Sequence, residues 1–325
     1  MPASSPQKSE SAITYSIVIP VYKNEESLPD VIERIEQMQS RLDAPLEAVF
    51  VVDGSPDGSL NTLRNLLPKS TFNSQLLAHS RNFGSFPAIK TGFKSARGQY
   101  IAAMAADLQE PSELIEDFFA QLKTGEWDVA VGIREGREDP LISRTLSKFY
   151  WSTYRKFVQP HMPPGGVDIF ATTRAVADKL GALNESNSSL IGLLFWLGYR
   201  RIEIPYTRQE RTHGKSAWSM RKKISYLLDS VFSFTSMPIT AILGLGLTGS
   251  ILSIVAAFAV FVSWLLGSVP VPGYTALMLV LLFSAGSILF AIGILGTYVW
   301  RTYENTKNRP SSILMSTEVF NDESV

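Results

Sequence analysis

The first half of the chain alternates short apolar runs with stretches in which apolar residues recur at helical spacing. The apolar runs predict strands at 15–22, 47–53, 74–80, 100–107 and 127–133. The helical spacing predicts helices at 27–42, 59–67, 86–97 and 111–123. This alternation is typical of an α/β domain with a mostly parallel sheet that helices cover on both faces.

The second half contains two long runs without a charged residue, at 239–267 and 274–300. Each run exceeds the roughly 20 residues that cross a bilayer core. Uncharged runs of this length are rare in the buried helices of soluble proteins, so the sequence predicts a transmembrane hairpin over 238–301. The short link 268–273 requires both outer ends of the hairpin to lie on the same side.

Basic residues flank the outer ends of this predicted hairpin, whereas its link carries no charge. These flanking residues are Arg221, Lys222, Lys223 and Arg301. By the positive-inside rule, the large N-terminal domain and both termini are expected in the cytoplasm. Apolar residues also recur at helical spacing over 219–237, which predicts an amphipathic helix lying on the membrane. The remaining segments are a disordered tail at 1–13, the α/β domain at 14–218 and a cytoplasmic tail at 302–325.

Composition excludes several classes of function. The 325 residues carry a net charge of zero, which gives no electrostatic case for a nucleic-acid partner. The chain has no cysteine, so disulfides, thiolate metal sites and a cysteine nucleophile are excluded. The first dozen residues are polar, and no signal peptide is visible among them.

Ligands of open parallel sheets bind beyond the carboxyl ends of the strands. That rule selects three segments, Pro20-Val21-Tyr22, Asp53-Gly54-Ser55 and Asp107-Leu108-Gln109. No G-x-G-x-x-G follows the first strand, and the Gly-Lys-Ser of "HGKSAW" lacks the upstream glycine of a P-loop because Gln209 occupies that position. Neither a Rossmann dehydrogenase nor a P-loop NTPase is supported.

Six motifs follow one another along the chain: "IVIPVYKNEESL", "VVDGSPDGS", "SRNFGSFPAIKTGF", "MAADLQEP", "GGVDIF" and "RQERTHGKSAWS". In this order, and with a membrane hairpin after them, they resemble the family-two glycosyltransferases of the GT-A fold. The resemblance is greatest to the membrane-bound polyprenyl-phosphate glycosyltransferases, which include dolichyl-phosphate mannose synthase and bacterial undecaprenyl-phosphate glucosyltransferases. It covers about residues 15 to 301.

The resemblance implies a nucleotide-sugar site at the first two strand ends. Pro20, Tyr22 and Glu25 correspond to the edge that binds the base, and Asp53 to the aspartate that meets uracil or guanine. Two structural alternatives remain open. Glu25 is also suited to the first turn of a helix, and Asp53 to stabilising an Asx-turn.

Asp107 corresponds to the second aspartate of the family's Asp-x-Asp metal motif, whose first position is Ala105 here. A hard cation such as Mg²⁺ needs only one or two protein carboxylates when a diphosphate supplies other oxygens. The loss of one aspartate therefore leaves a divalent cation, Mg²⁺ or Mn²⁺, as the expected cofactor, with Asp107 as its ligand. Gln109 is expected to contact a phosphate or a sugar hydroxyl.

Asp168 corresponds to the acceptor-side aspartate of the family, as a catalytic base or an orienting group; the alternative is a turn residue. Cations that follow it in sequence could bind the leaving diphosphate and a lipid phosphate. The expected binding residues are Arg208, Arg211, Lys215 and Ser216. The alternative for this basic segment is attraction to anionic lipid headgroups.

Together these features predict an inverting, metal-dependent transfer of a hexose from a nucleotide sugar to a polyprenyl phosphate. The expected protein is an integral membrane enzyme, in a bacterial inner membrane. Glucose from UDP-glucose is favoured, with mannose from GDP-mannose or an aminosugar as alternatives. A processive polysaccharide synthase and an inactive sugar-nucleotide-binding subunit are the rival functions. Small residues Gly244, Gly246 and Gly249 permit close helix packing and a homo-oligomer.

Overall fold

The computed structural model describes residues 13–135, 155, 162–163, 166–183, 185, 189–209, 229–266 and 273–321. The chain divides into two compact units. One contains Met1–Glu185, Ser189–Lys223 and Pro310–Val325; the other contains Ser186–Ser188 and Ile224–Arg309.

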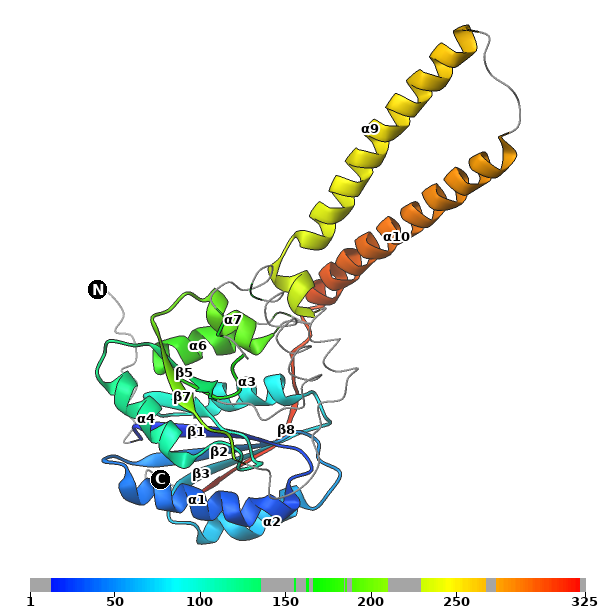
Figure 1. Ribbon diagram of the computed structural model, residues 1–325. Coiled ribbons are helices and arrows are strands. Elements are labelled where there is room, and N and C mark those ends of the chain that lie inside the picture. The colour runs from blue at the N-terminus through cyan, green and yellow to red at the C-terminus, as the bar shows by residue number, and fades with distance from the viewer. Residues whose placement is uncertain are drawn as a thin grey trace, which may run out of the picture. The chain divides into compact units, whose positions relative to one another are not determined.

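The first unit is built on one eight-stranded sheet with the strand order β7-β5-β6-β4-β1-β2-β3-β8 (Figure 1). The strands are β1 (Tyr15–Val21), β2 (Leu46–Val52), β3 (Asn73–His79), β4 (Tyr100–Ala103), β5 (Val129–Arg134), β6 (Phe170–Thr173), β7 (Arg201–Tyr206) and β8 (Leu314–Phe320). Strand β1 pairs in parallel with β2 and β4, as do β2 with β3 and β5 with β7. The predicted α/β fold with a mostly parallel sheet is confirmed.

Helices cover both faces of this sheet (Figure 1). They are η1 (Glu25–Ser27), α1 (Leu28–Arg41), α2 (Ser59–Leu66), η2 (Leu67–Lys69), α3 (Ser85–Ser95), α4 (Ser112–Lys123), α6 (Arg174–Ala182) and α7 (Leu190–Trp196). Helix α1 shows why they pack: Val31, Ile35 and Met38 recur at helical spacing and are fully buried. Helices α1, α2 and α4 lie on one face, and α3 and α6 on the other.

The order of the strands creates a topological switch point between β1 and β4. The chain proceeds outward through β1, β2 and β3, then returns to the other side of β1 to form β4. The loops that follow β1 and β4 therefore diverge at this switch point. Ligands of open α/β sheets bind at such a position.

Strand β4 is shorter than predicted, because it ends at Ala103 rather than at Asp107. Its last bond to β1 is donated by the backbone N–H of Met104 to the Val18 carbonyl, at 3.0 Å. Leu108 then adopts a left-handed conformation with φ of 59°, which a strand cannot accommodate. Asp107 consequently lies in a loop beyond the strand.

The structure corrects the prediction that residues 302–325 are only a tail. Helix α10 (Tyr274–Thr306) continues into it, and β8 then pairs antiparallel with β3 as the edge of the sheet. Arg64 of α2 forms a bidentate ion pair with Glu318, with its closer contact at 2.7 Å. The Asn321 amide donates to the carbonyls of Leu67 and Ser70 at 2.9 Å each. The end of the chain is thus part of the α/β unit.

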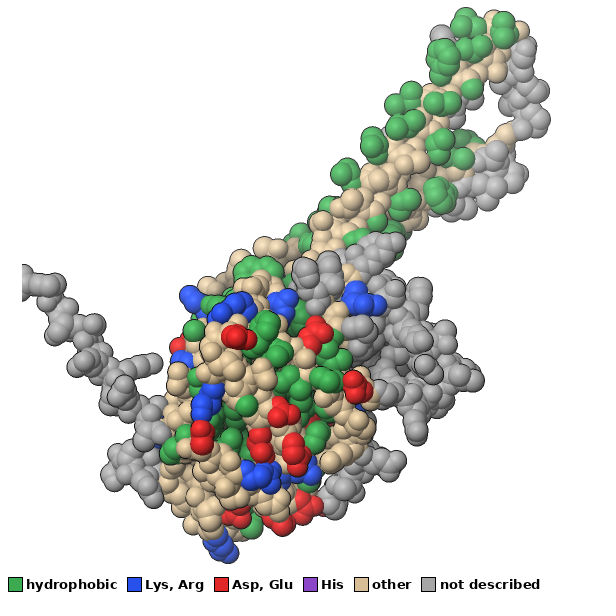
Figure 2. All heavy atoms as spheres, turned by 60° about the vertical axis from the view of Figure 1, so that its left-hand side comes forward, with side chains coloured by type: hydrophobic (Ala, Val, Ile, Leu, Met, Phe, Trp, Pro, Cys, Tyr) green, Lys and Arg blue, Asp and Glu red, His purple; other side chains and the backbone are tan. Residues whose placement is uncertain are grey.

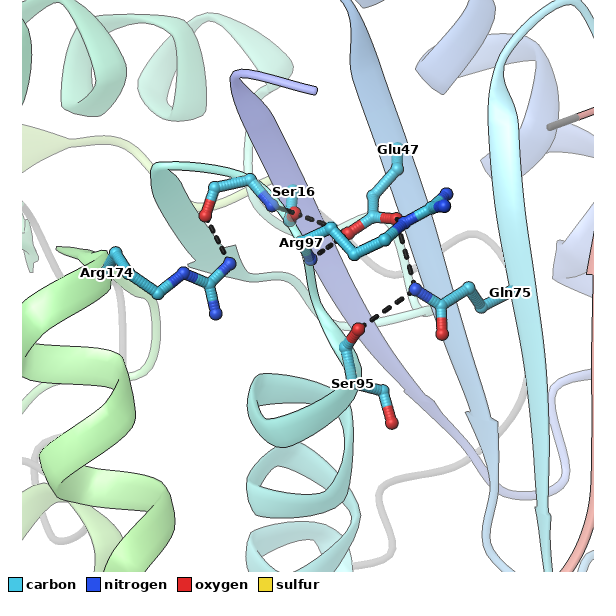
Figure 3. A network of polar contacts seen from close by, with 7 residues as sticks. Ser16, Glu47, Gln75, Ser95, Arg97 and Arg174 are labelled. Carbon is cyan, nitrogen blue, oxygen red and sulfur yellow. Dashed lines mark hydrogen bonds and ion pairs between the residues drawn. The ribbon is translucent and has the colours of Figure 1, made fainter. Parts of the chain in front are cut away.

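A buried carboxylate joins the amino ends of the central strands (Figure 3). Glu47 of β2 is fully buried and accepts hydrogen bonds from Ser16 Oγ at 2.8 Å, Arg97 Nε at 2.9 Å and Gln75 Nε2 at 3.1 Å. The Arg97 backbone N–H also donates to it. The negative charge of Glu47 is therefore compensated without solvent, and β1, β2, β3 and the start of β4 are held together at this end.

The second unit contains the two apolar runs as helices α9 (Met237–Leu265) and α10. Large hydrophobic side chains are exposed along both (Figure 2), such as Leu243, Phe258 and Phe283. Among the described residues, one helical segment, Phe283–Thr306, is long and apolar enough to cross a membrane, and Met237–Gly249 is a shorter apolar helix. One candidate membrane helix is therefore established, and the two-helix hairpin stays a prediction.

The predicted amphipathic helix at 219–237 lies mostly outside the described residues. Its described part is helical over 229–234. Asp229 accepts a hydrogen bond from Arg301 at 2.6 Å, within the same unit.

Removal of residues 310–325 should destabilise the α/β unit, because it uncovers the outer edge of β3 and removes the anchoring contacts of Glu318 and Asn321. We expect the melting temperature in detergent, followed by tryptophan fluorescence, to fall by about 5 °C or more. Removal of 322–325 alone is the control and should leave it unchanged. Equal melting temperatures for both truncations would contradict the integral role of β8.

Candidate active site

The side chains with potential chemistry gather at the carboxyl edge of the sheet. The contributing segments follow β1, β2, β3, β4, β5 and β7, or precede β6, which runs antiparallel to β4 and β5. They form two groups, one beyond β1, β2 and β3 and one beyond β4, β5 and β7.

In the first group, Glu25 joins the loop after β1 to the loop after β2. Its carboxylate accepts a hydrogen bond from the Gly58 backbone N–H at 2.7 Å, and its own backbone N–H donates to Asp57 Oδ2 at 3.2 Å. Pro20 and Tyr22 are half-buried beside this junction. The structure thus gives Glu25, one of the predicted base-binding residues, a bracing contact between the two loops.

Asp57, which the sequence analysis missed, organises the loop after β2. Its Oδ1 accepts from Ser55 Oγ at 2.6 Å and from Ser59 Oγ at 2.7 Å. Burial opposes ionisation of Asp57, but these hydroxyl donors outweigh it and lower the pKa of the carboxyl below its usual value. Asp57 is the second aspartate of the motif "VVDGSPDGS", and this position in the motif could have identified it from the sequence.

Asp53 is buried, and its carboxylate fastens the loop after β3. Oδ1 accepts from the Phe83 N–H at 2.8 Å and lies 2.8 Å from His79 Nδ1, while Oδ2 accepts from the Gly84 N–H at 2.7 Å. An ionised carboxylate has about four acceptor positions, so these contacts leave about one for a ligand. The partners come from residues 79–84 and not from an Asx-turn within its own loop.

Gly54, which follows Asp53, has φ of 56°, and a Cβ there would lie 2.3 Å from the backbone carbon of Arg81. Only glycine allows the loops after β2 and β3 to approach this closely.

In the second group, the loop after β4 meets the chain that leaves β7. The backbone N–H of Gln209 donates to the Gln109 carbonyl at 2.9 Å, and Arg208 Nη2 donates to the Gln109 side-chain oxygen. Asp107 Oδ1 receives a long contact of 3.4 Å from the Gln109 N–H. The predicted metal-side residues and the predicted cation Arg208 are therefore neighbours.

Helix α1 and the turn before it hold the loop after β4 by hydrogen bonds. Ser27 Oγ donates to the Ala106 carbonyl at 2.7 Å, and Arg34 Nη1 donates to the Glu110 carbonyl at 2.9 Å. These bonds hold the backbone on both sides of the left-handed Leu108.

Asp168 lies just before β6 and forms an ion pair with Arg134, the last residue of β5. The Asp168 side chain is 40% exposed, whereas that of Arg134 is 19% exposed, so the aspartate faces the open side. Tyr206, the last residue of β7, is buried beside them. Its burial, together with the negative charge of Asp168, raises the pKa of Tyr206 to about 12, so its hydroxyl remains protonated.

Glu110 is a second acidic group that the sequence analysis did not select. Its side chain is 4% exposed. Burial and then the negative charge of Asp107 raise the pKa of Glu110 to about 7, against the opposing charges of Arg208 and Arg134. Neither Arg134 nor Glu110 has a sequence signal of its own, because their roles depend on strands β5, β6 and β7 meeting in space.

The remaining predicted residues Arg211, Lys215 and Ser216 lie outside the described residues. Within the described part of the chain, no three acidic or histidine side chains are grouped closely enough to hold a metal ion by themselves. Asp107 is half-buried at the site edge and supplies hard oxygen ligands. This donor set fits a divalent cation that receives most of its ligands from a diphosphate substrate.

Replacing Glu110 with Gln should remove a pH dependence of stability. Between pH 4.5 and about 7, the folded protein binds more protons at Glu110 than the unfolded chain, so stability falls as the pH rises through this window. Gln stays neutral, and we expect the variant to be more stable than the wild type at pH 8, by at most about 3 kcal/mol, and similar at pH 4.5. Thermal unfolding at both pH values measures this.

The exposed Glu113 provides the control, because Glu113→Gln should change neither value. A Glu110→Gln variant that gains no stability at pH 8 would show that Glu110 does not carry this buried charge.

Comparison with known proteins agrees with this geometry. The model of the Glycosyl transferase family 2 matches residues 16–180. A glycosyltransferase of Synechocystis sp. is 31% identical over 301 residues, which cover 92% of this chain and 93% of the relative. The Bacillus subtilis glycosyltransferase CsbB is 30% identical over 94% of this chain and 92% of its own length.

A third relative, the SfII prophage-derived bactoprenol glucosyl transferase of Shigella flexneri, is 29% identical over 92% of this chain and 96% of its own. The α/β unit, with its mostly parallel sheet, has the GT-A fold that the sequence motifs implied. The protein is a transferase and belongs to glycosyltransferase family 2.

Proposed function

We propose that this glycosyltransferase transfers one hexose from a nucleotide sugar to a polyprenyl phosphate at the cytoplasmic face of a membrane. The observation that carries the proposal is the meeting of Asp107 and Gln109 with the cations Arg134 and Arg208 at one edge of the sheet. Such a group suits a reaction in which both the leaving group and the acceptor are phosphates. The bactoprenol glucosyl transferases among the relatives support it.

The donor occupies the first group of loops in this proposal. Pro20, Tyr22 and Glu25 border the base, and Asp53 offers its remaining acceptor position to an N–H of uracil or guanine. Uracil and guanine both present such a donor, so this contact does not separate UDP from GDP. Glucose from UDP-glucose is the favoured donor, because bactoprenol glucosyl transferases are among the relatives.

Asp107 holds the divalent cation in the proposed site, and Gln109 faces the diphosphate or the sugar. When bound, Mg²⁺ or Mn²⁺ neutralises the charge of the departing diphosphate. Arg208, which contacts Gln109, contributes a fixed positive charge to the same end of the site.

The acceptor phosphate lies between Arg134, Arg208 and Asp168. One of its oxygens forms the new bond to the anomeric carbon, the bond from that carbon to the nucleoside diphosphate breaks, and the configuration inverts. A phosphate monoester is already anionic near neutral pH, since its second pKa is about 6, so no strong base is required. Asp168, paired with Arg134, orients the acceptor in this account. Arg211, Lys215 and Ser216 extend the anion-binding segment beyond Arg208.

The membrane part follows the sequence prediction. Helices α9 and α10 form the transmembrane hairpin, with the α/β unit and both termini in the cytoplasm and the link 268–273 on the opposite side. The described segment Phe283–Thr306 is the part with direct support. Such an anchor suits an enzyme whose lipid acceptor keeps its tail in the bilayer.

A transfer assay tests the proposed function. The purified protein in detergent is incubated with Mg²⁺, undecaprenyl phosphate and radiolabelled UDP-glucose, GDP-mannose or UDP-N-acetylglucosamine in turn. We expect label to enter the lipid fraction from one donor, with UDP-glucose favoured. Polymer formation would indicate a processive synthase, and no product from any donor would contradict the proposal.

Asp107→Asn should nearly abolish transfer, because the proposed cation then loses its protein carboxylate. Ala105→Asp should change the cation concentration required for half-maximal rate only modestly, since the donor already supplies several oxygens. Rates measured across a Mg²⁺ titration test both variants, with Asp178→Asn on α6 as the control. Full activity in excess chelator would refute the metal assignment.

Arg208→Ala and Asp168→Asn should slow transfer to lipid while affecting donor binding less. Loss of one charge-assisted contact at Arg208 corresponds to about a 10- to 100-fold slower rate. Donor binding by calorimetry, measured beside the transfer rate, separates the two effects. Arg200→Ala is the matched control, because Arg200 pairs with Asp128 at the opposite end of β7. Loss of donor binding with normal transfer at saturating donor would exclude an acceptor-side role.

A further inference from the structure

A chain of hydrogen bonds, partly buried at Ser312 and buried at Thr91 and His79, leads from the C-terminal segment to Asp53. Ser312 Oγ lies 2.8 Å from Thr91 Oγ1, Thr91 Oγ1 lies 3.0 Å from His79 Nε2, and His79 Nδ1 lies 2.8 Å from Asp53 Oδ1. The His79 side chain is fully buried. These four residues come from separate elements: the segment before β8, helix α3, strand β3 and the loop after β2.

The partners define a direction for each hydrogen bond when the His79 ring is neutral. The Asp53 carboxylate only accepts, so Nδ1–H of His79 donates to it and Nε2 is left as an acceptor. The Thr91 hydroxyl then donates to Nε2, and its oxygen accepts from the Ser312 hydroxyl. In this arrangement both ring nitrogens of His79 and the hydroxyl hydrogens of Thr91 and Ser312 each have a hydrogen-bond partner.

This chain of hydrogen bonds ends at Asp53, whose carboxylate holds the backbone of the loop after β3. Asp53 accepts from the N–H groups of Phe83 and Gly84 at 2.8 and 2.7 Å, and the Phe83 ring packs edge-on against His79 with 5.6 Å between centroids. Gly84 is the N-cap residue of α3, with φ of 104°. The loop after β3 is therefore held at its two backbone donors and at one side chain.

Backbone contacts also hold the C-terminal segment beside β3. The Ser80 N–H donates to the Ile313 carbonyl at 3.0 Å. The pairing of β3 with β8 shifts register between Ala78 and His79, where Met315 is the extra residue. Such irregularities redirect the neighbouring chain, and this one occurs beside His79.

We propose that Ser312, Thr91 and His79 are positioning residues that hold Asp53 and the loop at 83–84 in the geometry needed for donor binding. The inference rests on the proposed function, in which Asp53 and its loop border the donor base. The residues that follow α10 thereby set the affinity for a soluble nucleotide sugar. This role is distinct from catalysis, because none of the three side chains is placed against the reacting atoms.

The first test follows the loop itself and requires no donor. Thr91→Val removes the hydroxyl and nearly keeps the shape, Ser312→Ala removes the first donor, and Thr91→Ser retains the hydroxyl. We expect hydrogen–deuterium exchange at the amides of Phe83 and Gly84 to rise about five- to tenfold in the first two variants. Thr91→Ser should exchange like the wild type.

The matched controls are buried hydroxyls without a hydrogen-bond partner in the described part of the chain, Thr172 and Ser74. Thr172→Val and Ser74→Ala should leave exchange at Phe83 and Gly84 unchanged. Unchanged exchange in Thr91→Val, or an equal rise in the controls, overturns the positioning role.

The second test separates binding from chemistry. In transfer assays with UDP-glucose and undecaprenyl phosphate, Thr91→Val and Ser312→Ala should raise KM for the donor about five- to tenfold and change kcat by less than about twofold. Thr91→Ser should restore KM. An unchanged KM, or a fall in kcat alone, overturns the inference. If the wild type uses none of UDP-glucose, GDP-mannose and UDP-N-acetylglucosamine, the proposed function fails, and the exchange measurement still decides the positioning role.

Discussion

The parallel pairing of β1 with β2 on one side and β4 on the other is the constraint on which the site depends. It forces the loops after β1, β2 and β4 to leave the sheet at one edge, where they diverge. The buried Glu47 network holds the opposite ends of these strands, so their register is fixed away from the chemistry (Figure 3). The hydrogen-bonded charge of Glu47 at the amino edge thus helps to fix the positions of the loops at the carboxyl edge.

Electrostatic balance distinguishes the two groups of loops. The first group, beyond β1, β2 and β3, uses its carboxylates internally, since Asp53 and Asp57 accept hydrogen bonds from backbone and hydroxyl groups. The second group mixes acids and cations at close range. Burial, and then the negative charge of Asp107, raise the pKa of Glu110 there, while Arg208 and Arg134 oppose the rise. A site of mixed charge, in which Asp107 is the proposed ligand of a cation, is suited to substrates that bring their own negative charge and oxygen ligands.

Apolar periodicity predicted five strands, the helices between them and the membrane-type helices, because burial leaves a direct trace in sequence. It also predicted the site loops, and the structure brings Asp107, Gln109 and Arg208 together. Strands β6, β7 and β8 escaped notice because they are short or half-exposed. Arg134, Glu110 and His79 could not be found from local pattern, since each acquires its role from partners remote in sequence.

In the proposed function, one protein carboxylate, that of Asp107, holds a divalent cation whose remaining ligands include oxygens of the donor diphosphate. Electron paramagnetic resonance of Mn²⁺ measures free against bound ion directly. The account predicts weak Mn²⁺ binding to the protein alone, much tighter binding when UDP is added, and no such gain in Asp107→Asn. Equally tight binding without nucleotide, or an undiminished gain in Asp107→Asn, would contradict it.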